Sequence, residues 1–126
     1  MHWSAGRGIK LLMADCLFCR IASGELPAER VHDDGEIFII KDINPAAPVH
    51  WLVIPHRHVE TILDMGEQDA ALLGRVYGVI GKQARAAGFA GDGYRVVANC
   101  NRDGGQTVFH VHFHLLAGRA LSWPPG

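Results

Sequence analysis

Residues 108–117 read VFHVHFHLLA, with His110, His112 and His114 at every second position. In a β-strand, side chains at i, i+2 and i+4 lie on one face, about 6.5–7 Å apart. The alternation therefore predicts a strand over residues 108–117 that carries three imidazoles on one face. Imidazole can act as acid, base, nucleophile or metal ligand near neutral pH, so this strand is the candidate active site.

The rest of the chain predicts an α+β fold around that strand. Leu17–Ser23 has apolar residues at helical spacing and stops at Gly24, which predicts a short helix. One long helix is predicted over residues 68–87, where a helical face recurs at Leu72, Leu73, Val76, Tyr77, Ile80 and Ala84. Further strands are predicted at Arg30–His32, Glu36–Lys41, Trp51–Ile54 and Tyr94–Ala98. Short turns, such as Asp33-Asp34-Gly35, favour an antiparallel, meander-like sheet of about five strands.

Length and composition predict one globular domain. A chain of 126 residues with 48% hydrophobic and 20% charged residues is large enough for one core. Its formal net charge is −1 and both signs are interspersed, so we expect no nucleic-acid partner.

The ends of the chain and its cysteines indicate a cellular setting. Residues 1–14 are predicted to form a loose extension before a domain at residues 15–126. Because Lys10 interrupts the apolar run near the N-terminus, we predict neither a signal peptide nor a membrane segment. Three cysteines, an odd count, do not suit a disulfide framework, so a reducing cytoplasm is the expected location.

A glycine loop precedes the histidines. Residues 104–107 read GGQT, which offers unobstructed backbone N–H groups, an amide and a hydroxyl. Such groups can hold phosphate oxygens without a metal. Without the neighbouring histidines, this short motif would more often indicate a simple turn.

Four segments resemble the histidine triad family of nucleotide hydrolases and transferases. They are HVHFHLL (110–116), DINPAAPVHWLVIPHRH (42–58), GYRVVANCNRDGGQTVFH (93–110) and GRALSWPPG (118–126). The last resembles the purine nucleoside phosphoramidase branch, also called the histidine triad nucleotide-binding branch. The resemblance implies a homodimer in which two sheets join into one, with a nucleoside monophosphate in each site.

The resemblance also implies roles for single residues. His112 corresponds to the nucleophile that attacks the α-phosphorus and forms a nucleotidyl-histidine intermediate, and His114 and His50 complete the catalytic set. Asp42 matches a ribose-binding aspartate, and Thr107 stands where the family commonly has serine. The implied nucleotide-binding residues are Phe18, Ile21, Asp42, Ile43, Asn99, Gly105, Gln106, Thr107, His112, His114 and Trp123.

A structural zinc site of some branches is matched as well. It would consist of Cys16, Cys19, His58 and His110, in which a CxxC pair and two histidines suit tetrahedral zinc. The phosphoramidase branch often lacks this set. If His110 binds zinc, it is not free to carry protons.

Several functions remain open at this point. The leading prediction is hydrolysis of purine nucleoside phosphoramidates to a nucleoside monophosphate and an amine, with no catalytic metal. Other branches of the family cleave dinucleoside polyphosphates or transfer nucleotides. A different mechanism would use a catalytic zinc held by His110 and His112. Finally, the chain could be a non-enzymatic module that binds a purine nucleotide, with the Trp123 tail meeting a partner.

Overall fold

The predicted strands pair into one antiparallel sheet with the order β1-β2-β3-β5-β4 in the computed structural model, which describes residues 15–126. The strands are β1 (Arg30–Asp33), β2 (Ile37–Lys41), β3 (Val49–Pro55), β4 (Tyr94–Val97) and β5 (Phe113–Ala117). The helices are α2 (Leu17–Ala22), α3 (Ala70–Ala87) and α4 (Asn101–Gly104), with 3₁₀ turns η1 (Ile62–Asp64) and η2 (Glu67–Asp69). The α+β prediction is confirmed, whereas the predicted extension at residues 1–14 lies outside the described residues.

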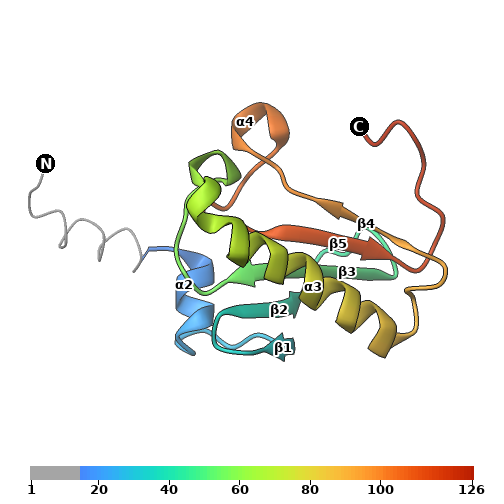
Figure 1. The fold of residues 1–126 in the computed structure, drawn as a ribbon, viewed down its shortest axis with the longest axis horizontal. Coiled ribbons are helices and arrows are strands. Elements are labelled where there is room, and N and C mark those ends of the chain that lie inside the picture. The colour runs from blue at the N-terminus through green and yellow to red at the C-terminus, as the bar shows by residue number, and fades with distance from the viewer. Residues whose placement is uncertain (1–14) are drawn as a thin grey trace, which may run out of the picture.

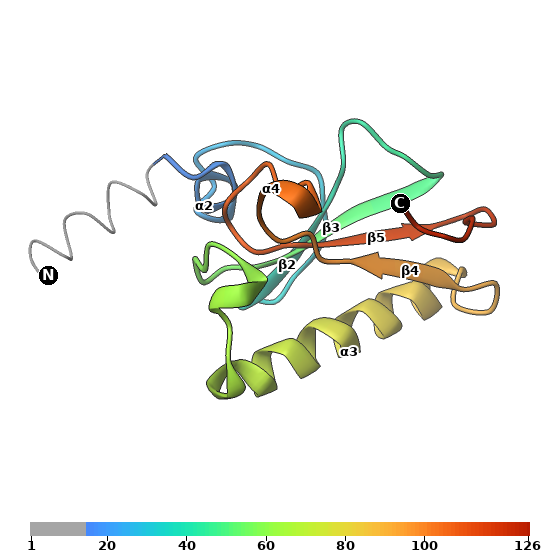
Figure 2. The same ribbon diagram turned by 90° about the horizontal axis from the view of Figure 1, so that it is seen from above.

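The sheet separates two apolar clusters, because neighbouring side chains of a strand point to opposite faces. Ile37 and Ile39 of β2 pack with α3, whereas Phe38 and Ile40 pack with α2. Figure 2 shows the same arrangement, with α3 below the sheet and α2 above it. The continuous apolar run of β2 is thus explained by burial on both faces.

The long helix was predicted well. Val76, Ile80 and Ala84 are fully buried against the sheet, and Gly88 ends the helix in a left-handed conformation with φ 88°. The helix begins at Ala70, after the turn η2, and not at residue 68. Figure 1 shows α3 crossing the sheet in front of β2 and β3.

The histidine strand is shorter than predicted. Strand β5 begins at Phe113, so His110 and His112 lie before it. The N–H of Val111 donates to the carbonyl of Val59 at 2.7 Å, which ties this segment to the loop after β3. The expected alternation nevertheless persists, since Phe113 faces the α3 cluster while His112 and His114 face the other side.

Two smaller boundaries also differ from the predictions. His50 lies inside β3, which begins at Val49, and not before the strand. Residues 99–106, which follow the predicted strand Tyr94–Ala98 and for which no helix was predicted, contain the short helix α4.

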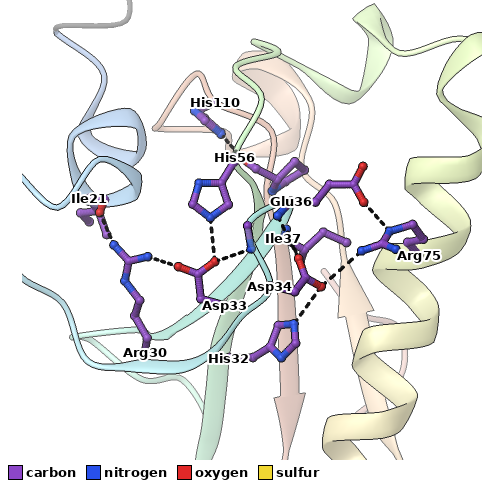
Figure 3. Close-up of polar contacts among 12 residues, drawn as sticks. Ile21, Arg30, His32, Asp33, Asp34, Glu36, Ile37, His56, Arg75 and His110 are labelled. Atoms are coloured by element: carbon purple, nitrogen blue, oxygen red, sulfur yellow. Dashed lines mark hydrogen bonds and ion pairs between the residues drawn. The ribbon is translucent and has the colours of Figure 1, made fainter.

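A polar network joins the β1–β2 hairpin to the two helices (Figure 3). Asp33 contacts His56 and Arg30, and Arg30 also donates to the carbonyl of Ile21 near the end of α2. Asp34, on the other side, accepts from Arg75 of α3. The hairpin therefore helps to fix the positions of α2 and α3 relative to the sheet.

No helix among residues 15–126 is long and apolar enough to cross a membrane.

Candidate functional site

A groove with a volume of about 950 Å³ lies on the α2 side of the sheet. Seven of the predicted nucleotide-binding residues line it: Phe18, Ile21, Asp42, Ile43, Thr107, His112 and His114. One end is polar, with two imidazoles and a carboxylate, and the wall formed by α2 is apolar. A groove with an apolar wall and a few convergent polar groups is the usual form of a small-molecule site.

Asn99, Gly105, Gln106 and Trp123 do not line this groove. Gly105 caps the end of α4 with φ 82°, directly before Gln106 and Thr107. Trp123 is 80% exposed, so its predicted contact with a nucleotide has no support within a single chain.

His112 is fixed as one tautomer. Its Nδ1 lies 2.8 Å from the carbonyl of His110, which can only accept a hydrogen bond, so Nδ1 carries the proton. Burial lowers the pKa of His112, although the His110 carbonyl and the Asp42 carboxylate oppose this shift. The neutral ring therefore presents an unprotonated Nε2, the atom that a nucleophile needs.

Asp42, His50 and His114 form a second polar group at the end of the groove. His50 Nε2 lies 2.9 Å from His114 Nδ1 and 3.4 Å from Asp42 Oδ2. The other oxygen of Asp42 accepts from the N–H of Asn44 at 2.7 Å. His50 and His114 meet because β3 and β5 pair with Leu52 opposite His114, which makes the two histidines diagonal neighbours.

The four predicted zinc ligands come together. The side chains of Cys16, Cys19, His58 and His110 each offer a ligand atom, and these atoms all lie within 4.8 Å of one another. His110 Nδ1 is 3.3 Å from Cys16 Sγ and 3.2 Å from His58 Nδ1. Residues from three distant parts of the chain thus form one compact group of two sulfurs and two nitrogens, the donor set that suits zinc.

The orientation of His110 fits a metal. Its Nε2–H donates to the carbonyl of Pro55 at 2.7 Å, so its unprotonated Nδ1 faces the cysteines. Burial lowers the pKa of His110 to about 4, which keeps the ring neutral. Burial, followed by the neighbouring Cys16, raises the pKa of the Cys19 thiol to about 12, so a metal would have to displace its proton.

The same geometry argues against a catalytic zinc held jointly by His110 and His112. The group that could hold a metal contains His110 but not His112. The Nδ1–H of His112 is engaged by the His110 carbonyl, and His112 lines the groove.

Comparison with known proteins now identifies the family. The model of the HIT domain matches residues 23–121, which is most of the chain. The chain belongs to the HIT domain family. Protein HitA of Neisseria gonorrhoeae is 41% identical over 104 residues, which cover 82% of this chain and 96% of HitA.

Solved structures of HIT proteins have the same fold. A HIT family hydrolase from Legionella pneumophila Philadelphia 1 is 48% identical with a TM-score of 0.87, and the match covers 89% of this chain and all of that one. A Zn-bound histidine triad family protein from Mycobacterium smegmatis is 34% identical with a TM-score of 0.71, covering 85% of this chain and 77% of that one.

The match to the HIT domain begins after α2, the helix that carries Phe18 and Cys19. Phe18 packs edge-on against both His110 and His112, with ring centroids 5.9 and 5.0 Å apart. The segment that supplies the two cysteines, with Cys16 directly before α2 and Cys19 within it, therefore also forms a wall beside the HIT histidines.

Gln106 has a different part from the one expected within the HIT glycine loop. It is buried, and its Oε1 accepts from the N–H of Asn101 while its Nε2 donates to the carbonyls of Glu60 and Val108. Both N–H donors and the oxygen of the amide are thus engaged within the chain, and Thr107 is the residue of the glycine loop that lines the groove.

Sequence analysis missed one wall of the groove. Leu26, Pro27 and Ala28 line it, and Leu26 and Ala28 also pack against the cluster that contains Phe18. The available signal was Pro27 shortly after Gly24, the residue at which the helix was predicted to stop, which indicates an extended segment returning past the helix.

Proposed function

We propose that this HIT protein hydrolyses purine nucleoside phosphoramidates to a nucleoside monophosphate and an amine, through a covalent intermediate on His112. The observation that carries the proposal is the neutral, oriented imidazole of His112, which has an unprotonated Nε2 and lines a groove of about 950 Å³. The description of the Legionella relative as a hydrolase supports the general class of reaction.

The chemistry divides one displacement into two. His112 Nε2 attacks the α-phosphorus, a P–N bond to the histidine forms, and the substrate P–N bond breaks. The amine leaves with the electron pair of that bond and takes up a proton from solvent. Water then attacks phosphorus and returns one proton to solvent, and the histidine–phosphorus bond breaks with its electron pair returning to Nε2, which releases the monophosphate and restores neutral His112.

The remaining groove residues have complementary parts in this proposal. Asp42 accepts hydrogen bonds from the ribose hydroxyls, and Phe18, Ile21 and Ile43 contact the base. The hydroxyl of Thr107 and the N–H groups of the loop that contains Asn99 and Gly105 hold the phosphate oxygens.

The direct test is cleavage of a fluorogenic adenosine phosphoramidate by the wild type and by His112→Ala. We expect kcat to fall roughly 10³-fold or more, because the variant has no nucleophile. His32→Ala, which changes a histidine outside the groove, is the matched control and is expected to keep wild-type turnover.

Equal rates for the wild type and His112→Ala would show that His112 is not the nucleophile. Cleavage of dinucleoside polyphosphates, or nucleotide transfer to a second substrate, in place of phosphoramidate hydrolysis would assign the chain to another branch. Tight binding of purine nucleotides with no turnover of any of these compounds would leave a binding module.

A structural zinc ion is the second part of the proposal. Cys16, Cys19, His58 and His110 would hold it, and the Zn-bound Mycobacterium smegmatis relative supports the choice of metal. When bound, it would supply a rigid link between α2 and the histidine segment, with no part in bond cleavage.

The third part is a homodimer in which two sheets join. The sheet has open edges at β1 and β4, and exposed edge strands are ready sites for pairing with another chain. Size-exclusion chromatography with light scattering would check the mass of the protein, which is expected to be twice the 13.7 kDa of one chain.

A further inference from the structure

His112 and His114, two residues apart, are held as opposite tautomers. The backbone N–H of Ala46 donates to His50 Nδ1 at 2.9 Å, so the proton of neutral His50 is on Nε2. That Nε2–H points at His114 Nδ1, 2.9 Å away, which must then accept. His114 therefore carries its own proton on Nε2, whereas His112 carries its proton on Nδ1.

His50 does not line the groove itself and contacts it through His114 and Asp42, which do. Its side chain is 8% exposed, and it is absent from the residues that line the groove, whereas His114 lines it. A group that does not face the ligand acts on it through a neighbour that does. In the proposed reaction, His50 is thus a positioning residue and not a catalytic one.

Asp42 supports the same arrangement electrostatically. Its Oδ2 lies 3.4 Å from His50 Nε2, and its position is fixed because Oδ1 accepts from the N–H of Asn44. A carboxylate at this distance favours a proton on the nitrogen that faces it.

His114 itself stays neutral. Burial, followed by the nearby His112 and His50, lowers the pKa of His114, and Asp42 alone opposes the shift. A neutral ring whose Nδ1 accepts has one N–H left to offer, which is the Nε2–H.

Asp42, His50 and His114 also have the spacing of a metal site, since their ligand atoms lie within 4.8 Å of one another. The Ala46 N–H argues against that use. It occupies the lone pair of His50 Nδ1 and leaves the proton on Nε2, the nitrogen that faces the other two groups. A protonated nitrogen has no lone pair for a metal.

We propose that His50 and Asp42 hold His114 as the Nε2–H tautomer. His112 then presents a lone pair, and His114 presents a hydrogen-bond donor, to the same phosphoryl group. The substrate named here rests on the proposed function, whereas the tautomers rest on the hydrogen bonds of the chain itself. His112 attacks phosphorus, and His114 donates to a phosphoryl oxygen whose negative charge grows in the transition state.

The first experiment determines the tautomers of His112 and His114 in the absence of substrate. Long-range ¹H–¹⁵N spectra of the full chain near pH 7 should show protonated Nε2 for His114 and protonated Nδ1 for His112. His50→Leu should lose the fixed tautomer of His114, whereas His50→Gln should keep it, because the glutamine amide can donate to His114 Nδ1. Glu29→Gln removes a carboxylate of the same groove that is paired with Lys41, and it should leave His114 unchanged.

The second experiment measures turnover of the adenosine phosphoramidate. We expect His50→Leu to lower kcat roughly 10- to 100-fold with little change in KM, and His50→Gln to restore most of the loss. Asp42→Asn should lower kcat by a similar factor for a 2′,3′-dideoxy substrate and for the ribose substrate. A role limited to ribose binding predicts that the Asp42→Asn effect disappears with the dideoxy substrate.

The outcomes separate the two proposals. A protonated Nδ1 on His114 in the wild type, or an unchanged His114 tautomer in His50→Leu, overturns the tautomer assignment whatever the activity. A wild type that does not cleave phosphoramidates but has the expected spectra overturns the proposed substrate and leaves the tautomer assignment standing. If His50→Leu does not fold, the wild-type and His50→Gln spectra still decide.

Discussion

Gln106 engages both N–H donors and the oxygen of its side-chain amide inside the chain, although its place in a glycine loop indicated a phosphate contact. Three hydrogen bonds tie it to Asn101, Glu60 and Val108. Asn101 is also the one non-glycine residue of the described chain with positive φ, 61°. At the scale of single residues, the loop is therefore held by the amide and presents Thr107.

Gln106→Ala is expected to destabilise the chain by about 1–3 kcal/mol, because it removes the three hydrogen bonds of a buried side-chain amide. Urea denaturation at pH 7 measures the change. Arg102→Ala, at a side chain that is 93% exposed, is the control and should alter the free energy of unfolding by less than about 0.5 kcal/mol. Equal free energies of unfolding for the two variants would contradict the claim that the Gln106 amide stabilises the loop.

At the scale of elements, the β1–β2 hairpin is stabilised by the carboxylate of Asp34 (Figure 3). Its Oδ1 accepts from the N–H groups of Glu36 and Ile37, and its Oδ2 contacts His32 at 3.0 Å. Burial tends to raise the pKa of Asp34, but these hydrogen bonds and His32 outweigh it and lower the pKa to about 2.

Asp34 should make stability depend on pH in acid. A carboxyl with a lowered pKa in the folded chain stabilises the fold above its unfolded pKa of 3.8, and this contribution is lost as the pH falls toward about 2. Asp34→Asn should thus be less stable than the wild type by about 2 kcal/mol at pH 6, and the gap should narrow by about 1 kcal/mol by pH 3.

Urea denaturation at both pH values checks this expectation for Asp34→Asn. Asp103→Asn, at a side chain that is 88% exposed, should show no such narrowing. A constant gap between the wild type and Asp34→Asn would mean that the carboxylate charge does not stabilise the hairpin.

Helix α3 depends on its buried face. Ile80 has no exposed surface and packs between the helix and β-strands of the sheet, so Ile80→Ala is expected to cost about 2–5 kcal/mol through lost contacts and a cavity. Leu63→Ala, at a residue that is 73% exposed, is the control. A loss below about 1 kcal/mol for Ile80→Ala in thermal or urea unfolding would show that the core relaxes around the change.

At the scale of the whole molecule, the four candidate metal ligands connect α2, the segment after β3 and the segment before β5. Zinc binding should therefore raise the unfolding temperature of the metal-free chain. With free zinc at 1,000 times Kd, the expected stabilisation is about 4 kcal/mol. Cys19→Ser should abolish most of it, and Cys100→Ser, outside the group, should not.

Zinc binding should also release protons, because the pKa of the Cys19 thiol is about 12 in the folded, metal-free chain. Titration calorimetry in buffers of different ionisation enthalpy counts these protons. Affinity should fall as the pH is lowered. Binding without proton release would exclude thiolate ligands.

The strand and helix patterns could be predicted from sequence because they depend on local periodicity. The α3 face, the β1–β2 turn and the alternation around His114 follow from neighbours a few residues apart. The boundary of β5 could not be predicted, because it depends on a hydrogen bond between Val111 and Val59, which no local pattern records.

In the candidate site, too, some features follow from the sequence and others depend on tertiary contacts. The sequence by itself determined the α+β architecture, the candidate histidines and, through family resemblance, the candidate zinc ligands. Only the tertiary structure decided that Gln106 is consumed within its loop, that His110 turns toward the cysteines, and that His112 and His114 hold opposite tautomers. The sequence specifies the type of each side chain. The tautomer and the hydrogen-bond partner of that side chain depend on backbone carbonyls and N–H groups that only folding brings close to it.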